Sequence, residues 1–194
     1  RLLLYYEFLF GMDNKDDFRD IGVVGLGAGT LSDLAMGNDR VKIDFFEINP
    51  QMLEVANNTK YFTYLERSKD KVDVKMGDGR LMLKKEKDGK YDLLMIDAYS
   101  SDSIPFHMIT KEAVDIYLDK VKSDGLLLLH ISSRYYNLTN VVSTIVSSLN
   151  NDNKSNYKLM SYKDDISRWL AIVEGKQVDI LTRNGFTEVE KIVG

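Results

Sequence analysis

The segment Val23–Thr30 (VVGLGAGT) places three glycines directly after an apolar run. A β-strand that ends in closely spaced glycines lets the backbone approach a ligand where side chains would clash. Glu47 follows at the end of the next apolar run, about 20 residues later. A carboxylate at the tip of the neighbouring strand is placed to accept hydrogen bonds from ribose hydroxyls. The two features together predict a nucleoside-binding site at one edge of a β-sheet.

The spacing of the glycines narrows the kind of nucleotide. A dinucleotide-binding turn would have glycine or alanine at position 30, where this chain has Thr30. The segment Gly25–Gly29 therefore does not indicate a tight pyrophosphate pocket of the NAD type.

Apolar, β-branched runs alternate with helical patterns along the chain, which is typical of an α/β fold with a mostly parallel sheet. The runs 91–97 and 125–132 are almost continuously apolar, as expected of central strands that helices cover on both faces. We predict seven strands, near residues 21–26, 41–48, 72–76, 91–97, 125–132, 157–162 and 168–174. We predict helices near residues 2–11, 30–37, 50–58, 79–86, 110–122 and 138–149.

Two of these helices have clear starting signals. Asn49 precedes Pro50, so it predicts an N-cap followed by proline in the first helical position. Thr110 likewise stands as a cap in front of an apolar stripe that includes Ala113 and Tyr117. The polar segment 150–156 is expected to be a loop, and residues 175–194 carry no motif that we can interpret.

The composition excludes several classes of site. The 194 residues are 44% apolar, enough for one domain spanning residues 1–194 with a substantial core. The chain has no cysteine and two separated histidines, so we expect no disulfide and no metal site. A net charge of −4 without a basic run argues against a nucleic-acid partner.

No apolar run approaches the roughly 18 residues that a membrane-spanning helix needs. We therefore expect a cytoplasmic protein. The chain begins with Arg1 and not with methionine, which leaves open that it is part of a longer chain.

Further polar residues follow the later strands. Asp78 lies between two glycines after the third predicted strand, where it indicates either a simple turn or a contact to the amine of an adenine. Asp97 ends the strongly apolar fourth strand, so a purely structural role would need a partner to offset its burial. Asp102 and His107 lie in the loop that follows, each as a surface residue or as part of a pocket. His130, inside an apolar strand, is expected to be a hydrogen-bonded core histidine.

The order of the glycine loop, Glu47, Asp78 and Asp97 resembles that of the class I S-adenosylmethionine-dependent methyltransferase fold, which is Rossmann-like. More narrowly, it is similar to the spermidine synthase family of aminopropyltransferases within that fold. These enzymes place a Tyr-His/Gln-Glu segment upstream of the glycine loop, and Tyr5-Tyr6-Glu7 looks like it.

Three segments extend this resemblance, which covers about residues 2–174. Asp97 with Asp102 and Pro105 looks like the family's acidic Asp-Ser-x-Asp-Pro loop. The segments 105–113 and 130–135 are similar to bacterial spermidine synthase-like proteins that are often fused to a membrane transporter-like domain, so such an upstream domain is an expectation here.

The resemblance implies a role for each matching residue. The cofactor would be S-adenosylmethionine or its decarboxylated form, with no metal. Asp97 would be the catalytic residue that accepts a proton from a small amine such as putrescine. The residues implied for cofactor binding are Gly25, Gly27, Gly29, Glu47, Asp78 and Gly79. Those implied for the substrate side are Tyr5, Tyr6, Asp102 and His107, with residues 1–20 as an N-terminal helical segment. Homodimers are common in the family, so a homodimer is expected by analogy.

Two departures from the family's pattern leave three functions open. The family's glycine loop carries an aspartate where this chain has Ala28, and the second aspartate of the acidic loop falls at Ser100. Asp102 comes two residues after that position, so the two changes remove or displace carboxylates that would recognise amines. An aminopropyltransferase, a methyltransferase of unknown acceptor and a non-catalytic nucleoside-binding module therefore all remain.

Overall fold

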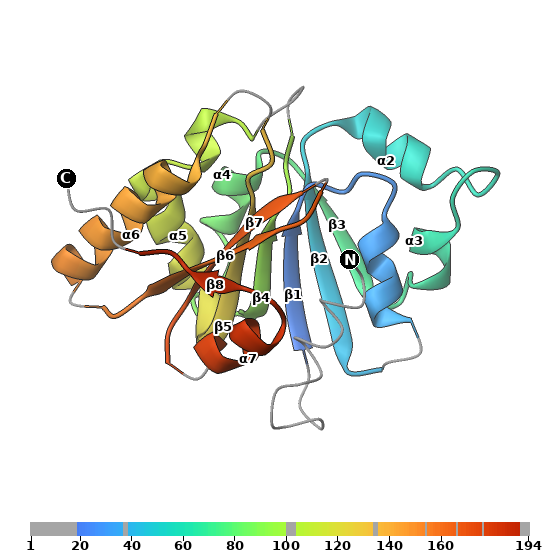
Figure 1. Cartoon of the computed structure of the whole chain (residues 1–194). Helices are drawn as coiled ribbons and strands as arrows, with labels where there is room; N and C mark the ends of the chain where they lie inside the picture. Colours follow the sequence, from blue (N-terminus) through green and yellow to red (C-terminus); the bar gives the residue numbers. More distant parts are fainter. Residues whose placement is uncertain are drawn as a thin grey trace.

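A twisted β-sheet with helices packed against both faces forms the centre of the molecule (Figure 1). The computed structural model describes residues 19–36, 39–99, 104–133, 136–153, 155–165, 167–175 and 177–190. The predicted helix at 2–11 lies outside these ranges. The α/β class predicted from the alternating pattern is confirmed.

The sheet has eight strands in the described ranges, in the order β3-β2-β1-β4-β5-β7-β6-β8. The five neighbouring strands β3, β2, β1, β4 and β5 are parallel to one another. β7 is antiparallel to both of its neighbours, and β8 is antiparallel to β6. The strands are β1 (Arg19–Val24), β2 (Val41–Glu47), β3 (Val72–Met76), β4 (Tyr91–Ile96), β5 (Val121–His130), β6 (Lys158–Lys163), β7 (Arg168–Val173) and β8 (Thr187–Glu188).

The predicted number of seven strands misses β8. This strand is two exposed residues long, which is too short for an alternating pattern to be recognised.

The helical segments differ from the prediction in length and type. They are η1 (Thr30–Ala35), α2 (Pro50–Ala56), α3 (Tyr64–Arg67), α4 (Gly79–Leu83), η2 (Phe106–Met108), α5 (Lys111–Lys120), α6 (Thr139–Asn153) and α7 (Gln177–Arg183). The predicted helix at 30–37 is the 3₁₀ segment η1, and α6 continues into the polar stretch that was expected to be a loop. The short segments α3, η2 and α7 were not predicted.

The two predicted helix starts are confirmed. The side chain of Asn49 accepts a hydrogen bond from the backbone N–H of Gln51 at 3.0 Å, ahead of Pro50. Thr110 Oγ1 accepts from the N–H of Ala113 at 3.2 Å. Each cap satisfies a backbone donor that has no partner inside its helix.

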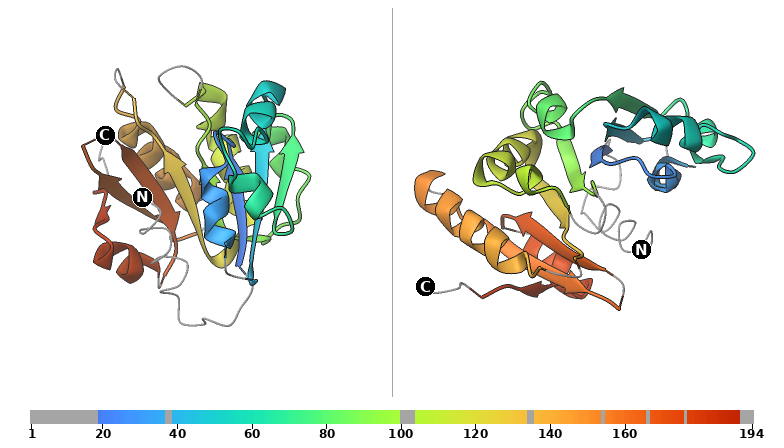
Figure 2. Two further views of the ribbon diagram at one scale, coloured as in Figure 1. Left: turned by 90° about the vertical axis from the view of Figure 1, so that its right-hand side faces the viewer. Right: turned by 90° about the horizontal axis from the view of Figure 1, so that it is seen from above.

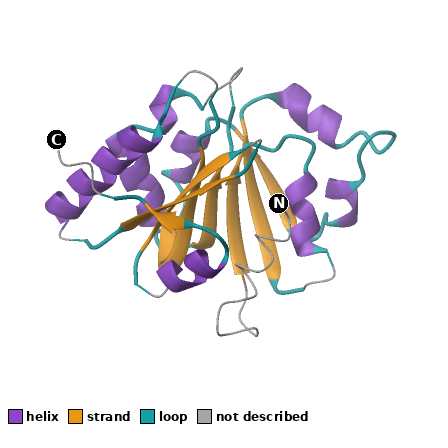
Figure 3. Cartoon of the chain, in the orientation of Figure 1, coloured by secondary structure: helices purple, strands orange, loops and turns teal. Residues whose placement is uncertain are grey.

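Alternate residues of the central strands feed two separate layers of core. Leu93 and Met95 of β4 pack with residues of η1, α3 and α7, whereas Leu94 and Ile96 pack with residues of α4, α5 and α6. Figures 2 and 3 show these helices lying on opposite faces of the sheet. All six residues of β4 are buried, which explains its continuous apolar pattern. No helix in the described ranges is long and apolar enough to cross a bilayer.

The strand order creates a crevice at the carboxyl edge of the sheet. β1 pairs with β2 on one side and with β4 on the other, so the chain leaves β1 and β4 towards opposite faces. In open α/β sheets, ligands bind at this switch of direction. The residues that follow β1, β2, β3 and β4 all reach it.

A cluster of charged residues, the Asp44 cluster, joins three of these strands. It consists of Asp44, Lys75, Glu86, Lys90 and Tyr91. Lys75 Nζ lies 2.8 Å from Asp44 Oδ2 and 2.6 Å from Glu86 Oε1. Lys90 bonds the same two carboxylates, and the hydroxyl of Tyr91 donates to Asp44 Oδ2 at 2.8 Å.

Charge and burial oppose one another at Asp44. Burial would raise the pKa of its carboxyl group, but hydrogen bonds from Lys75, Lys90 and Tyr91 outweigh burial and lower the pKa below its ordinary value. The ionised form of Asp44 is therefore favoured by folding.

We expect Asp44→Asn to lower the free energy of unfolding by about 1–3 kcal/mol at pH 7, because it removes the negative charge of the acceptor shared by two lysines and Tyr91. The lowered pKa means that Asp44 stabilises the protein above the pKa of an unfolded aspartate. That contribution is lost as the pH falls through the lower folded value. The difference in the free energy of unfolding between the variant and the unchanged protein should therefore become smaller below about pH 4. Urea unfolding at a series of pH values measures it.

Asp73 supplies the control. It lies beside Asp44 in the β2–β3 register and is exposed, so Asp73→Asn should change the free energy by less than about 0.5 kcal/mol. An Asp44→Asn deficit that stayed constant down to low pH would contradict the assigned role of the charge.

Candidate functional site

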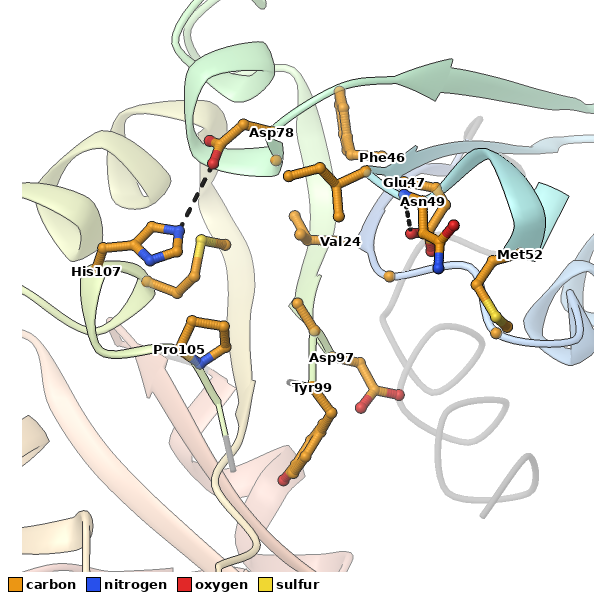
Figure 4. Close-up of a pocket in the computed structure, with 16 residues that line it drawn as sticks. Val24, Phe46, Glu47, Asn49, Met52, Asp78, Asp97, Tyr99, Pro105 and His107 are labelled. Carbon is orange, nitrogen blue, oxygen red and sulfur yellow. Dashed lines mark hydrogen bonds and ion pairs between the residues drawn. The ribbon is translucent and has the colours of Figure 1, made fainter. Parts of the chain in front are cut away.

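A cavity of about 620 Å³ opens at the carboxyl edge of the sheet, over the ends of β1, β2 and β4 (Figure 4). It is lined by Val24, Gly25, Gly27, Phe46, Glu47, Ile48, Asn49, Met52, Asp78, Gly79, Asp97, Ala98, Tyr99, Pro105, His107 and Met108.

The cavity brings together most of the residues predicted from the sequence. These are Gly25, Gly27, Glu47, Asp78, Gly79, Asp97 and His107. Gly29 does not line it. Tyr5, Tyr6 and Asp102, predicted for the substrate side, lie outside the described residues.

The apolar walls of the cavity were not predicted from the sequence. Val24, Phe46 and Met52 supply apolar side chains, and Tyr99 adds an aromatic ring. In a sequence, apolar residues such as Val24 and Phe46 in strands and Met52 in a helix look like ordinary core. Only the strand order reveals that these stand at the edge over the cavity.

The three glycines of the loop have three different roles. A Cβ at Gly25 would lie 2.4 Å from the carbonyl oxygen of Asp97, so this glycine lets the backbones of two strands meet. Gly27 has φ of +54°, and no atom lies within 4 Å of where its Cβ would stand. Its open side faces the cavity, where a ligand could approach the backbone. Gly29 has φ of +77° ahead of η1, and its Cβ would meet Leu65 at 3.1 Å.

The carboxylate of Glu47 ties the glycine loop to the start of α2. Oε2 accepts a hydrogen bond from the backbone N–H of Leu26 at 2.9 Å, and Oε1 accepts from that of Asn49 at 2.8 Å. The residue is only 8% exposed. Each carboxylate oxygen has a further lone pair, so Glu47 can still accept a hydrogen bond from a ligand hydroxyl.

Asp78 lies across the cavity from Glu47 (Figure 4). Its Oδ1 accepts from the N–H of Leu81 at 2.9 Å and so caps α4, while Oδ2 lies 3.6 Å from Nε2 of His107. A Cβ at Gly79 would stand 2.3 Å from Cγ1 of Val24, so this turn packs directly on β1. Arg80 donates to the carbonyl oxygen of His107 at 3.0 Å and ties the two loops together.

Asp97 lies just beyond the end of β4. Its backbone N–H donates to the carbonyl oxygen of Val24 at 2.9 Å, and its side chain is 34% exposed at the cavity. Oδ1 lies 2.6 Å from Nδ1 of His130. A purely structural role for Asp97 would need such a partner, and His130 supplies one, while the carboxylate also lines the cavity. His130 is hydrogen-bonded as expected, but its position beside Asp97 was not predicted.

The described ranges contain no group of three His, Asp or Glu side chains arranged to hold a metal ion. The polar side chains that line the cavity include three carboxylates, those of Glu47, Asp78 and Asp97, spaced along an apolar wall. This arrangement suits an organic ligand with hydroxyl and amine groups.

No known family model matches the chain. Among curated proteins, the polyamine aminopropyltransferase of Vibrio vulnificus is 30% identical over 109 residues, which are 55% of this chain and 35% of that protein. The eEF1A lysine and N-terminal methyltransferase of Mus musculus is 35% identical over 120 residues, 58% of this chain and 17% of that protein. The chain thus spans well under half the length of these relatives.

Solved structures agree on the fold. A probable spermidine synthase from Corynebacterium glutamicum superposes with a TM-score of 0.71 at 10% identity, covering 98% of this chain and 75% of that one. A spermidine synthase in complex with the transition state analogue AdoDATO superposes with a TM-score of 0.64 at 16% identity, covering 89% of this chain and 61% of that one. Human methyltransferase-like protein 13 in complex with SAH superposes with a TM-score of 0.64 at 20% identity, covering 94% of this chain and 83% of that one. The class I methyltransferase fold is therefore confirmed.

The different surroundings of two glycines in the loop predict different effects of the same substitution. Gly25→Ala should lower the free energy of unfolding by about 2–4 kcal/mol, because the new methyl group meets the backbone of Asp97. Gly27→Ala should cost about 1–2 kcal/mol for its left-handed backbone. It should also weaken binding of S-adenosylmethionine, the ligand expected from the resemblance, by about tenfold or more.

Urea unfolding and calorimetry measure the two effects separately. Equal losses of stability in the two variants, with the affinity of Gly27→Ala unchanged, would contradict this division of roles.

Proposed function

We propose that this chain, which fits the spermidine synthase-like family, is a transferase that binds an S-adenosylmethionine-type nucleoside in the cavity and transfers an aminopropyl group to a small amine. The observation that carries the proposal is the placement of Glu47, Gly27 and Asp78 around one cavity with Asp97 at its end. The similarity to polyamine aminopropyltransferases supports it.

The cavity suits the nucleoside part of such a donor. Glu47 would accept hydrogen bonds from the ribose hydroxyls, and the open backbone at Gly27 would pass beneath the sulfur-bearing chain. Asp78 and Gly79 would hold the adenine against the apolar walls. The donor supplies a positively charged sulfur, which is already a good leaving group.

The protein's own part in the reaction concerns the acceptor amine. A free alkylamine has a pKa of about 10 and is mostly protonated at neutral pH. Asp97 would bind this cation and accept its proton, so that the nitrogen lone pair becomes available. The amine nitrogen then forms a bond to the carbon next to the sulfur, and the electron pair of the broken C–S bond stays on sulfur. Holding both reactants in one cavity supplies much of the rate.

Methyl transfer is the second candidate. Ala28 supplies no carboxylate to grip an aminopropyl ammonium, and a methyltransferase is among the similar curated proteins. Both reactions would use the same nucleoside site and differ in the group attached to sulfur. A non-catalytic nucleoside-binding module is the third candidate, and Asp97 at the cavity argues against it.

One experiment separates the candidates. We expect calorimetry to rank decarboxylated S-adenosylmethionine at least equal to S-adenosylmethionine, and incubation of the decarboxylated form with putrescine to release methylthioadenosine. Release of S-adenosylhomocysteine from S-adenosylmethionine would instead favour methyl transfer. Weaker binding of the decarboxylated form would overturn aminopropyl transfer, and binding of neither donor would overturn the nucleoside site.

Asp97→Asn tests the catalytic assignment. The amide cannot accept the amine's proton, so turnover should fall by about 100-fold or more. Affinity for the nucleoside should stay within about threefold, because Glu47 and Asp78 are untouched. Steady-state rates and calorimetry measure the two quantities.

Asp124→Asn serves as the control, since Asp124 is an exposed aspartate on β5 and does not line the cavity. Its rate should match that of the unchanged protein. Undiminished turnover in Asp97→Asn would remove Asp97 from the catalytic role.

A further inference from the structure

His130 belongs to a row of side chains that crosses three strands at the carboxyl edge. Ile96 of β4 is in register with Leu129 of β5, so Asp97 and His130 are the next residues along their parallel strands. His130 is in turn the register partner of Trp169 on β7. The row therefore begins with Asp97 at the cavity and continues across the sheet to His130 on β5 and Trp169 on β7.

The imidazole of His130 is held between two aromatic rings. The ring of Trp169 stacks on it at 4.1 Å with an interplanar angle of 9°. The ring of Tyr99 is tilted against it, with ring centroids 4.7 Å apart and an interplanar angle of 57°. The Tyr99 hydroxyl donates to the carbonyl oxygen of Ser132 at 3.0 Å. With 13% of its side chain exposed, His130 has little room to rotate.

The hydrogen bonds around the ring assign its proton. The ionised carboxylate of Asp97 can only accept a hydrogen bond, so its contact with Nδ1 places a proton on that nitrogen. In the neutral ring the Ser132 hydroxyl then donates to Nε2 at 2.8 Å, while its oxygen accepts from the backbone N–H of Arg168 at 2.8 Å. Nε2 is then the acceptor, and the proton of the neutral ring lies on Nδ1. Nδ1–H donates to Asp97 Oδ1 at 2.6 Å.

This contact leaves one oxygen of the carboxylate for the cavity. Oδ1 of Asp97 is engaged by His130, whereas no described residue donates a hydrogen bond to Oδ2. The other histidine differs, since His107 Nε2 lies 3.6 Å from Asp78 and its side chain is 56% exposed. Of the two histidines, only His130 pairs a carboxylate, that of Asp97, with a partly buried imidazole stacked on an aromatic ring.

The geometry points to His130 as a positioning residue for Asp97. Its Nδ1–H holds Oδ1, so that Oδ2 meets the acceptor amine in a fixed direction and receives its proton. This inference rests on the proposed transferase function. It adds a residue that lies outside the cavity lining and acts through Asp97.

The first test does not depend on activity. The chain has two histidines, so long-range ¹H–¹⁵N NMR spectra of the full chain, with His130→Asn for assignment, resolve the ring of His130. We expect Nδ1 to carry a proton at pH 8, and Asp97→Ala to move the proton of the neutral ring towards Nε2. A proton on Nε2 alone in the unchanged protein would overturn the pairing.

The second test compares two side chains of the same shape. Asparagine can place an N–H donor where Nδ1 stands, whereas leucine has the same branching without a donor. His130→Asn should keep kcat within about fivefold, and His130→Leu should lower it by about 30- to 100-fold with KM for the nucleoside within about threefold. Equal losses in the two variants would overturn the positioning role.

Lys122→Gln is the matched control. Lys122 of β5 bonds Asp92 of β4 at 2.8 Å, so it too supports a β4 carboxylate from β5, but at the other end of both strands. It should lower stability while leaving kcat unchanged. Absence of any transfer by the unchanged protein would overturn the proposed function, and the NMR result would still decide whether His130 holds Asp97.

Discussion

The site depends on backbone hydrogen bonds that continue each parallel pairing one residue beyond a strand. The N–H of Gly25 donates to Phe46, that of Asp97 donates to Val24, and that of Gly77 donates to Glu47, at 2.9, 2.9 and 2.8 Å. Each bond fixes the first residue of a functional turn against the neighbouring strand. At Gly25 the two backbones leave no room for a side chain, because a Cβ there would collide with the carbonyl oxygen of Asp97. The carboxylates of the cavity are thus placed by the sheet, and the loops after them begin from fixed points.

Much of this arrangement could be predicted from the sequence. The alternating pattern gave the parallel strands, and the residues after them, Glu47, Asp78 and Asp97, meet at one cavity as expected. Gly29 was also expected beside the ligand; it does not line the cavity, and a Cβ there would meet Leu65. Glycine spacing alone does not reveal which neighbour requires each glycine. β8 was missed because two exposed residues show no period.

His130 illustrates what a linear sequence hides. Its partners Asp97 and Trp169 are 33 and 39 residues away along the chain, and they meet only because β4, β5 and β7 are neighbours. An apolar strand ending in histidine looks like core packing. Given the strand order, the same three positions could be aligned from the register alone.

The row that supports Asp97 has a consequence for how acceptor specificity could change. The backbone N–H of Asp97 donates to the carbonyl oxygen of Val24 after β1, and its carboxylate is paired with His130 of β5, so both of these hydrogen bonds come from neighbouring strands. If Asp97 is the proton acceptor as proposed, the fold holds the reacting group through β1 and β5, and related chains could then diverge in acceptor while they retain one reaction.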